Sequence, residues 1–256
     1  MAYGFRRYVP VGARMRNAER ETARMRADGI NVSPVRIEGR LIARTFWGKA
    51  WCDHLESFSD FENRLPRGRT YVRNGSVCHL EIKRGAVNAR VQGSLLYAVT
   101  IQIDPLGKPE WKSIKKRCSG RISSLIDLLQ GKLSDGVMAV VTDRQKGLFP
   151  SPREIHMRCS CPDWAVMCKH VAATLYGVGA RLDESPQLLF LLRGVDHNEL
   201  VDEHAETAVQ AAVKSGTGRR IADKDIAEVF GIDVDPPPRK TAKKRGRRKP
   251  PKSRKR

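Results

Sequence analysis

The sequence predicts an α+β fold: an antiparallel β-meander with packed helices, a small zinc-binding hairpin-helix module and a disordered basic C-terminal tail. Three patterns support this prediction. Apolar residues alternate with polar ones over residues 78–103, which is typical of half-buried strands, and they recur at spacings of three and four elsewhere, which is typical of amphipathic helices. Three cysteines and a histidine lie within residues 159–170, which indicates a metal site.

The first forty residues are rich in arginine and poor in apolar side chains, so we expect a basic arm, partly disordered, over residues 1–40. One polar helix is possible over residues 17–27. The ordered body is expected to begin near Leu41. Residues 41–150 then form an amino-terminal α+β domain.

A helix is predicted from Thr45 to Phe61, because its apolar residues share one helical face. Trp47 and Trp51 lie one turn apart on that face. Paired tryptophans can stack on nucleic-acid bases, but large aromatic side chains on a helical stripe more often pack in a core. We therefore expect both in the core.

A meander of three or four strands is predicted after Pro66 and Gly68, which we interpret as helix breakers. One face of the sheet is apolar. The other face is expected to be solvated, with contact to a nucleic-acid backbone as the alternative. That polar face carries His79, Glu81, Lys83, Asn88, Arg90, Gln92, Thr100 and Gln102.

The remaining predicted elements are mostly helical. Helical spacing covers residues 111–130, with a break near Gly120, and residues 136–143 form a short buried strand or a helix end. A helix that follows the cysteines is expected to end near Gly179. Further helices starting at 186, 199 and 223 make residues 183–235 a helical C-terminal region.

Thiolate and imidazole are the ligands that Zn²⁺ prefers, which predicts a zinc site at Cys159, Cys161, Cys168 and His170. Residues two apart on an extended segment point to the same side, so the first two cysteines can both bind the metal. A closed set of four ligands leaves no position for a catalytic water, which makes the zinc structural.

Two details of this module, residues 151–182, follow from the spacing. Cys168 is expected just before a helix, with His170 in the first helical turn and turned back towards the metal. Trp164 is expected to pack against the metal site. His156 is an alternative ligand in place of His170.

The other three cysteines, Cys52, Cys78 and Cys118, are scattered singly, so we expect buried thiols in a reducing compartment. No apolar run approaches the ~20 residues needed to cross a bilayer, and the first residues lack the apolar core of a signal peptide. We expect a cytoplasmic protein, associated with the nucleoid if it is bacterial, and no membrane partner.

The formal net charge of +20 predicts a polyanionic partner, with DNA as the first candidate. Twelve of the cations lie in residues 239–256, which contain no acidic residue. Repulsion between so many like charges predicts a disordered tail over residues 236–256. The expected nucleic-acid contacts are Arg158, Lys169, Arg181, Lys244, Arg245, Arg247, Arg248 and Lys249.

Two short motifs carry resemblances. The tail run from Lys244 to Pro250 resembles an AT-hook, although Arg248 replaces the proline that usually follows the Arg-Gly-Arg core, so we expect phosphate binding rather than minor-groove specificity. The alternative to DNA binding is that the tail only increases solubility or acts like a nuclear-localisation signal.

The pattern C-x-C-x₆-C-x-H at residues 159–170 resembles the SWIM zinc finger. Further runs, Trp47-Gly48-x-x-Trp51, Arg67-Gly68-Arg69-x-Tyr71 and Val91-x-Gly93-Ser94-x-x-Tyr97-x-Val99, resemble the amino-terminal part of bacterial SWIM proteins. The resemblance implies binding to DNA or to partner proteins, often beside SWI2/SNF2-type helicase ATPases.

The sequence contains no phosphate-binding glycine loop and no metalloprotease or hydrolase motif, so we expect no catalytic activity. Three hypotheses remain. The first is a zinc-stabilised nucleic-acid-binding accessory protein, and the second is a protein-interaction module that docks a SWI2/SNF2-type helicase ATPase, with the tail as a DNA tether. The third is a cryptic nuclease or transposition factor. Its nearest acidic cluster is Asp196, Glu199, Asp202, Glu203 and Glu206, with His197 and His204, and we expect this cluster to be a solvated face.

Overall fold

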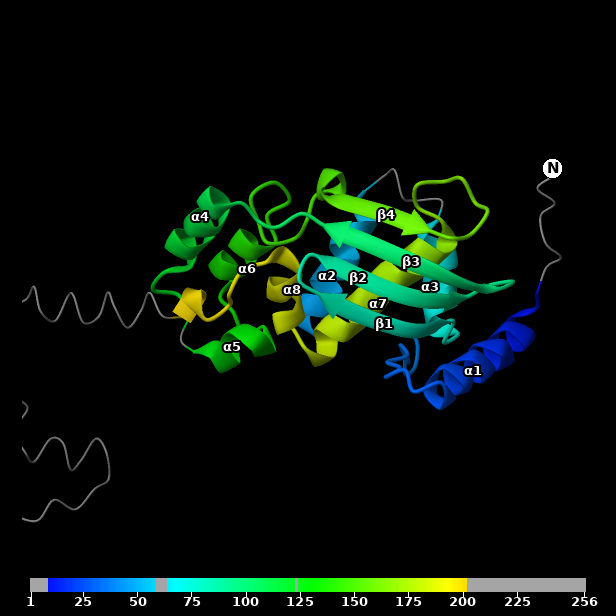
Figure 1. Ribbon diagram of the computed structural model, residues 1–256. Coiled ribbons are helices and arrows are strands. Elements are labelled where there is room, and N and C mark those ends of the chain that lie inside the picture. The colour runs from blue at the N-terminus through cyan, green and yellow to red at the C-terminus, as the bar shows by residue number, and fades with distance from the viewer. Residues whose placement is uncertain (1–8, 59–63, 123, 202–256) are drawn as a thin grey trace, which may run out of the picture. The chain divides into compact units, whose positions relative to one another are not determined.

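A four-stranded antiparallel sheet, in the order β1-β2-β3-β4, organises the chain in the computed structural model (Figure 1). The structure describes residues 9–58, 64–122 and 124–201. The predicted meander is confirmed, and a fourth strand joins it from much later in the sequence. The strands are β1 (Val77–Lys83), β2 (Ala86–Gln92), β3 (Leu96–Ile103) and β4 (Ile155–Cys159).

Helices cover one face of this sheet and lie at its ends, while most of the other face is open in the described part of the chain, and the predicted α+β class is confirmed (Figure 1). A short 3₁₀ turn, Pro152–Glu154, leads into β4. The helices are α1 (Val11–Ala27), α2 (Phe46–Glu56), α3 (Leu65–Arg73), α4 (Lys108–Cys118), α5 (Leu125–Gln130), α6 (Asp135–Val141), α7 (Lys169–Glu184) and α8 (Gln187–Arg193).

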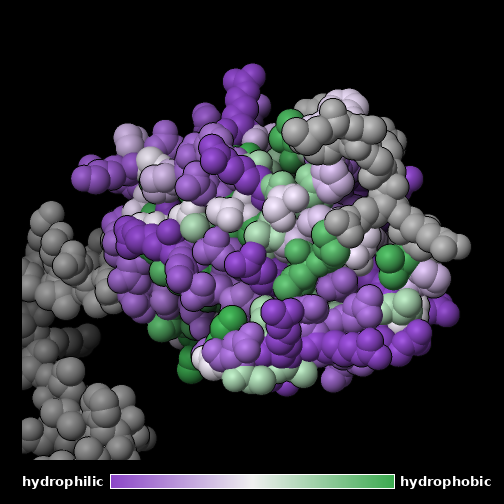
Figure 2. Space-filling model, turned by 45° about the vertical axis from the view of Figure 1, so that its right-hand side comes forward, coloured by the Kyte–Doolittle hydropathy of each residue, from purple (hydrophilic) through white to green (hydrophobic). Residues whose placement is uncertain are grey.

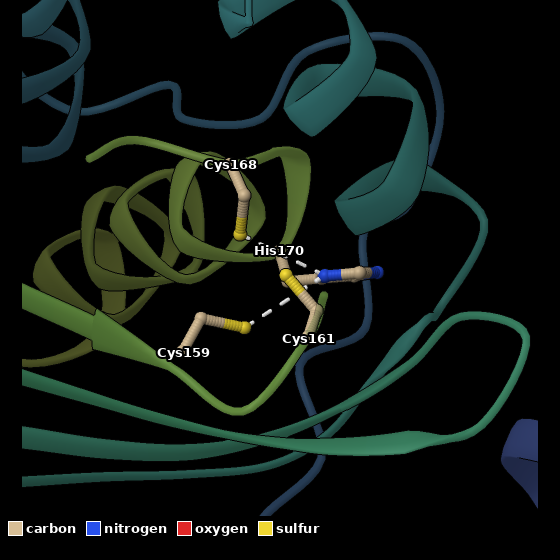
Figure 3. Close-up of side chains that lie close together, drawn as sticks. All are labelled: Cys159, Cys161, Cys168 and His170. Carbon is tan, nitrogen blue, oxygen red and sulfur yellow. Dashed lines mark hydrogen bonds between the residues drawn. The ribbon is translucent and has the colours of Figure 1, made fainter. Parts of the chain in front are cut away.

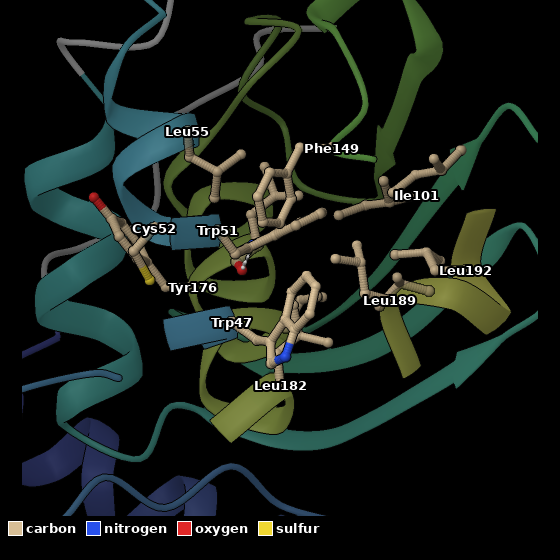
Figure 4. Close-up of a cluster of buried hydrophobic side chains, with 14 of the residues drawn as sticks. Trp47, Trp51, Cys52, Leu55, Ile101, Phe149, Tyr176, Leu182, Leu189 and Leu192 are labelled. Carbon is tan, nitrogen blue, oxygen red and sulfur yellow. Dashed lines mark hydrogen bonds between the residues drawn. The ribbon is translucent and has the colours of Figure 1, made fainter. Parts of the chain in front are cut away.

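The main core lies between one face of the sheet and α7, which crosses behind all four strands (Figure 1). Helices α2 and α3 pack against α7 from the other side. Trp47 and Trp51 are fully buried in this core and are not available to bases (Figure 4). Their indole N–H groups donate to the carbonyls of Leu128 (2.8 Å) and Leu175 (2.9 Å), so burial leaves no polar group unpaired.

The segment expected to be a mobile basic arm contains α1, which begins at Val11 rather than at Asn17. The helix packs through Ala18 and Met25 against Cys78 of β1, in a second, smaller hydrophobic cluster. Its apolar content is thin because a buried arginine, Arg14, supplies part of the packed face. A pattern search that counts only apolar residues therefore underestimates this helix.

The residues interpreted as breakers, Pro66 and Gly68, lie inside α3. Proline is tolerated in the first turn of a helix, where its missing N–H has no partner to lose. Gly68 marks a close approach to α7, because a Cβ at this position would lie 2.4 Å from the Cβ of Ala172. The glycine allows this close packing, and the interpretation of Pro66 and Gly68 as helix breakers was wrong.

Two further helices differ from the prediction. The segment expected as a short buried strand or a helix end forms a short helix of its own, α6 (Asp135–Val141), and the helix expected to end near Gly179 continues to Glu184. Gly179 allows α7 to approach α2 closely, since a Cβ there would lie 2.7 Å from the sulfur of Cys52. The predicted break near Gly120 is confirmed, with φ of +80° at that residue.

The three scattered cysteines are buried thiols, as predicted: Cys52, Cys78 and Cys118. Burial is the main reason why the pKa of Cys52 is raised to about 12 and that of Cys118 to about 11. Among the described helices, none is long and apolar enough to span a membrane. Most of the helix predicted from residue 199, the helix predicted from residue 223 and the basic tail lie outside the described residues.

The contact between α3 and α7 gives a first prediction. Gly68→Ala should lower the free energy of unfolding by about 1–3 kcal/mol, because the added methyl group forces the two backbones apart. Gly12→Ala on exposed α1 is the matched control, with no atom closer than 3.6 Å to the new Cβ, and it should stabilise by about 0.5–1 kcal/mol. Urea unfolding measures both, and equal effects would contradict the packing argument.

Candidate metal centre

The end of β4 and the start of α7 bring four ligand-type residues together. Cys159 pairs with Val99 of β3 at the last position of β4, and the next residue, Ser160, exchanges hydrogen bonds with Ala98 (3.0 and 2.9 Å). This pairing fixes the turn that carries Cys161. Cys168 is the extended N-cap residue of α7, as predicted, and His170 lies in the first helical turn.

The ligand atoms of Cys159, Cys161, Cys168 and His170 all lie within 4.8 Å of one another. Figure 3 shows their side chains converging, with the Nδ1 atom of His170 at 3.8 Å from the sulfur of Cys159 and 3.7 Å from that of Cys168. In a tetrahedral zinc site, with bonds of about 2.3 Å to sulfur and 2.0 Å to nitrogen, ligand atoms lie about 3.5–3.8 Å apart. The donor set and its spacing therefore fit a bound metal ion.

The structure selects His170 over the alternative ligand His156. His156 is exposed on the opposite face of the sheet, and its Nε2 atom pairs with the carboxylate of Asp104 at 3.1 Å. Within residues 9–58, 64–122 and 124–201, no second group of Cys, His, Asp and Glu has comparable geometry.

Hydrogen bonds within the cluster already favour one thiolate. The pKa of Cys168 is lowered to about 3, chiefly because the thiol of Cys159 donates a hydrogen bond to its sulfur, with burial opposing and His170 and the backbone N–H of Val171 assisting. The pKa of Cys159 is raised by the same hydrogen bond and by burial. Metal binding would displace the remaining thiol protons, so affinity should rise with pH.

Two tyrosines hold the ring of His170. The ring centroid of Tyr97 lies at 4.5 Å and that of Tyr71 at 5.5 Å. The Nε2 atom is buried and has no hydrogen-bond partner among the described residues, and a Cβ at Gly93 would lie 2.6 Å from it. Packing against the two tyrosines orients this ligand, rather than the hydrogen bond that the second ring nitrogen of a metal-binding histidine usually donates.

Sequence reasoning did not identify Tyr71 or Tyr97 as site residues. Both lie in the upstream runs that carry the family resemblance, so that signal was present. Two cations lie over the ring of Tyr71. The Cζ atom of Arg14 is 4.0 Å from the ring centroid, and the Nζ atom of Lys169 is 5.7 Å from it. Their charge offsets that of three thiolates around a divalent ion.

The predicted nucleic-acid contacts separate into three groups. Arg158 is exposed on β4, and Lys169 is half-buried beside Tyr71. Arg181 is not available, because its guanidinium donates to Ser33 and Pro34 (2.7–3.2 Å) and pairs with Glu184. The five contacts predicted in the tail lie outside the described residues: Lys244, Arg245, Arg247, Arg248 and Lys249.

Two other expectations concern Trp164 and the acidic cluster. Trp164 does not pack against the metal site, since 91% of its surface is exposed. Of the acidic residues considered for a nuclease, Asp196 and Glu199 are described, and the carboxylate of Glu199 accepts hydrogen bonds from Trp111 (3.0 Å) and Lys115 (2.8 Å). That carboxylate is therefore part of a structural contact.

Comparison with known proteins finds one informative relative. A Mycobacterium tuberculosis protein described as "Uncharacterized protein Rv2102" is 33% identical over 208 residues, which cover 77% of this chain and 75% of the relative. No protein-family model matches the chain. No solved structure matches it either.

From the four converging ligands we expect about one metal ion per chain after purification without chelator. Inductively coupled plasma mass spectrometry measures this metal content. Cys168→Ser should remove the ion and lower the free energy of unfolding by about 3 kcal/mol or more, a loss of roughly 6–12 °C in Tm. A variant that keeps its metal and its Tm would contradict the assignment.

The choice between the two histidines has a separate test. His170→Ala should abolish stoichiometric metal binding, because it removes the only imidazole whose nitrogen faces the described cysteine sulfurs. His156→Ala, on the opposite face of the sheet, should leave the metal content unchanged. The reverse pattern would make His156 the ligand.

Proposed function

The chain belongs to the same family as the Mycobacterium tuberculosis protein Rv2102, and we propose that it is a zinc-stabilised accessory protein that binds nucleic acid, DNA above all, without catalysing a reaction. The observation that carries this proposal is a closed set of four buried or half-buried ligands in a chain of net charge +20, which exposes arginines on the sheet and on α1.

Zinc is the metal that we propose. Three thiolates and one imidazole suit a borderline-soft ion, and the spacing of the ligand atoms suits tetrahedral coordination. With four protein ligands, no coordination position is left for water or substrate. The metal would therefore hold the end of β4 and the start of α7 together, and it would act as a scaffold for the fold rather than as a reactive centre.

The face of the sheet opposite α7 is one candidate surface for nucleic acid. Glu81, Asn88, Thr100 and Arg158 form one polar row across all four strands. Arg90 and Lys83 are exposed on neighbouring rows of this face. Among the residues predicted to line it, Gln92 differs, because it is buried at the end of β2.

Helix α1 adds a second source of positive charge. Arg16, Arg20 and Arg24 are exposed and follow one another at intervals of four, so they lie along one side of the helix. Their Cα atoms are about 6 Å apart along the helix axis. In Figure 2, hydrophilic residues line the lower edge of the face, where α1 lies. Polar side chains and arginines in this arrangement can contact a phosphate backbone.

A second candidate function is protein docking, with a SWI2/SNF2-type helicase ATPase as the proposed partner and the basic tail as a DNA tether. The specific observation in its favour is the pair of exposed apolar residues next to the metal centre, Trp164 and Val166. Tryptophan is enriched at the energetic centres of protein interfaces.

The test of the first proposal is the salt dependence of DNA binding by the metal-loaded full-length protein. Affinity should fall steeply with salt, and Arg158→Ala should reduce the slope of log K against log [salt] by about 1 if it removes one phosphate contact. Arg153→Ala is the matched control, because it removes an equally exposed charge just before β4 and should leave the slope unchanged.

Two outcomes would contradict the proposal. Absence of binding to DNA and RNA by the full-length protein at low salt would exclude it altogether. If a variant that ends at Asp235 loses all binding, while Cys168→Ser leaves binding by the full-length chain intact, the tail alone binds and the metal-supported surface has no part in it.

A further inference from the structure

A tryptophan is displayed next to the metal centre. We call residues 162–167 the zinc loop, because the ligands Cys161 and Cys168 flank it. Trp164 in this loop is 91% exposed, whereas the other three tryptophans are buried in the core. Val166, two residues later, is 74% exposed. A large apolar ring left in water gains no stabilisation from burial, so its position calls for a reason other than folding.

The zinc loop is held in place at several points. Its first side lies against α3, because the carboxylate of Asp163 pairs with Arg64 at 3.4 Å and also accepts a hydrogen bond from the N–H of Ala165 at 3.2 Å. Its second side is anchored by Met167, which is 4% exposed and belongs to the main core. The indole of Trp164 therefore lies in a loop that is fixed on one side by Asp163 and on the other by Met167.

Basic residues lie close to this loop. Arg64, the N-cap residue of α3, pairs with Asp163 of the loop, and Arg67 follows three residues later in α3. Lys169, the first residue of α7, follows the ligand Cys168. The one acidic side chain within the zinc loop, Asp163, is paired with Arg64. An exposed aromatic ring among cations is the arrangement that single-strand binding proteins use, with stacking on a base and ionic contact to phosphates.

We propose that Trp164 is a stacking platform for an unpaired base, so that the protein prefers single-stranded nucleic acid to a duplex. This inference rests on the proposed function and names its substrate class. In a duplex the faces of the bases are covered by their neighbours, and an indole on a surface loop can reach a base face only where the strand is unpaired.

The experiment compares a fluorescein-labelled 20-nucleotide single strand with the corresponding duplex, by fluorescence anisotropy on metal-loaded full-length protein. Trp164→Ala should weaken single-strand binding about 5- to 150-fold, the equivalent of one lost stacking contact, and should change duplex binding less than about twofold. Trp164→Phe should keep most of the affinity. Val166→Ala is the control for loss of apolar surface in the same loop, and metal content and Tm check that each variant folds.

The outcomes separate the two proposals. If wild-type protein binds neither strand form at low salt, the proposed function fails. If it binds but Trp164→Ala retains single-strand affinity, or loses single-strand and duplex affinity equally, the stacking platform is wrong and the proposed function stands. Loss of a protein partner in Trp164→Ala, with unchanged nucleic-acid affinity, would make the loop a protein-docking site.

Discussion

The ring of His170 is the contact on which the arrangement around the metal centre depends. It presents Nδ1 to two cysteine sulfurs, while its other edge lies against the backbone of Gly93 and its faces pack near Tyr71 and Tyr97. The guanidinium of Arg14, in α1, lies over the ring of Tyr71. Through one side chain, the ligand set is joined to α1, α3, the β2–β3 hairpin and α7. A shift of this ring would disturb all of them, because tightly packed interiors transmit small displacements.

The parts of the fold that could be predicted are those with a strong local signal. The alternation over residues 78–103 predicted three strands, and the spacing of Trp47 and Trp51 predicted a buried helical face. The ligand set followed from residue chemistry, and its convergence needed only an extended segment followed by a helix start. The pairing of β4 with β3 joins positions more than fifty residues apart, and no local pattern specifies such a partner.

The errors share a physical cause, which is that one residue type serves two purposes. Glycine ends helices, but it also allows two helices to touch, and Gly68 and Gly179 do the second. Arginine usually indicates a solvated surface, yet Arg14 is 5% exposed, and Arg181 ties α7 to the segment around Ser33. Tryptophan usually indicates a core, and Trp164 is outside it. In each case, residues distant in the sequence determine whether the side chain is buried or exposed, and a local sequence pattern does not identify those residues.

In the candidate metal centre, the ligands and the exposed side chains of the loop between them lie in different environments. The ligands belong to the sheet and to α7, where Cys168 and His170 are almost fully buried, so their geometry is set by the core. Between Cys161 and Cys168 the chain is tied at both ends and leaves Trp164 and Val166 in solvent. Because Asp163 and Met167 anchor the loop, its exposed side chains Trp164 and Val166 can change with little effect on the ligand set. The proposed binding surface would then be independent of the candidate metal site.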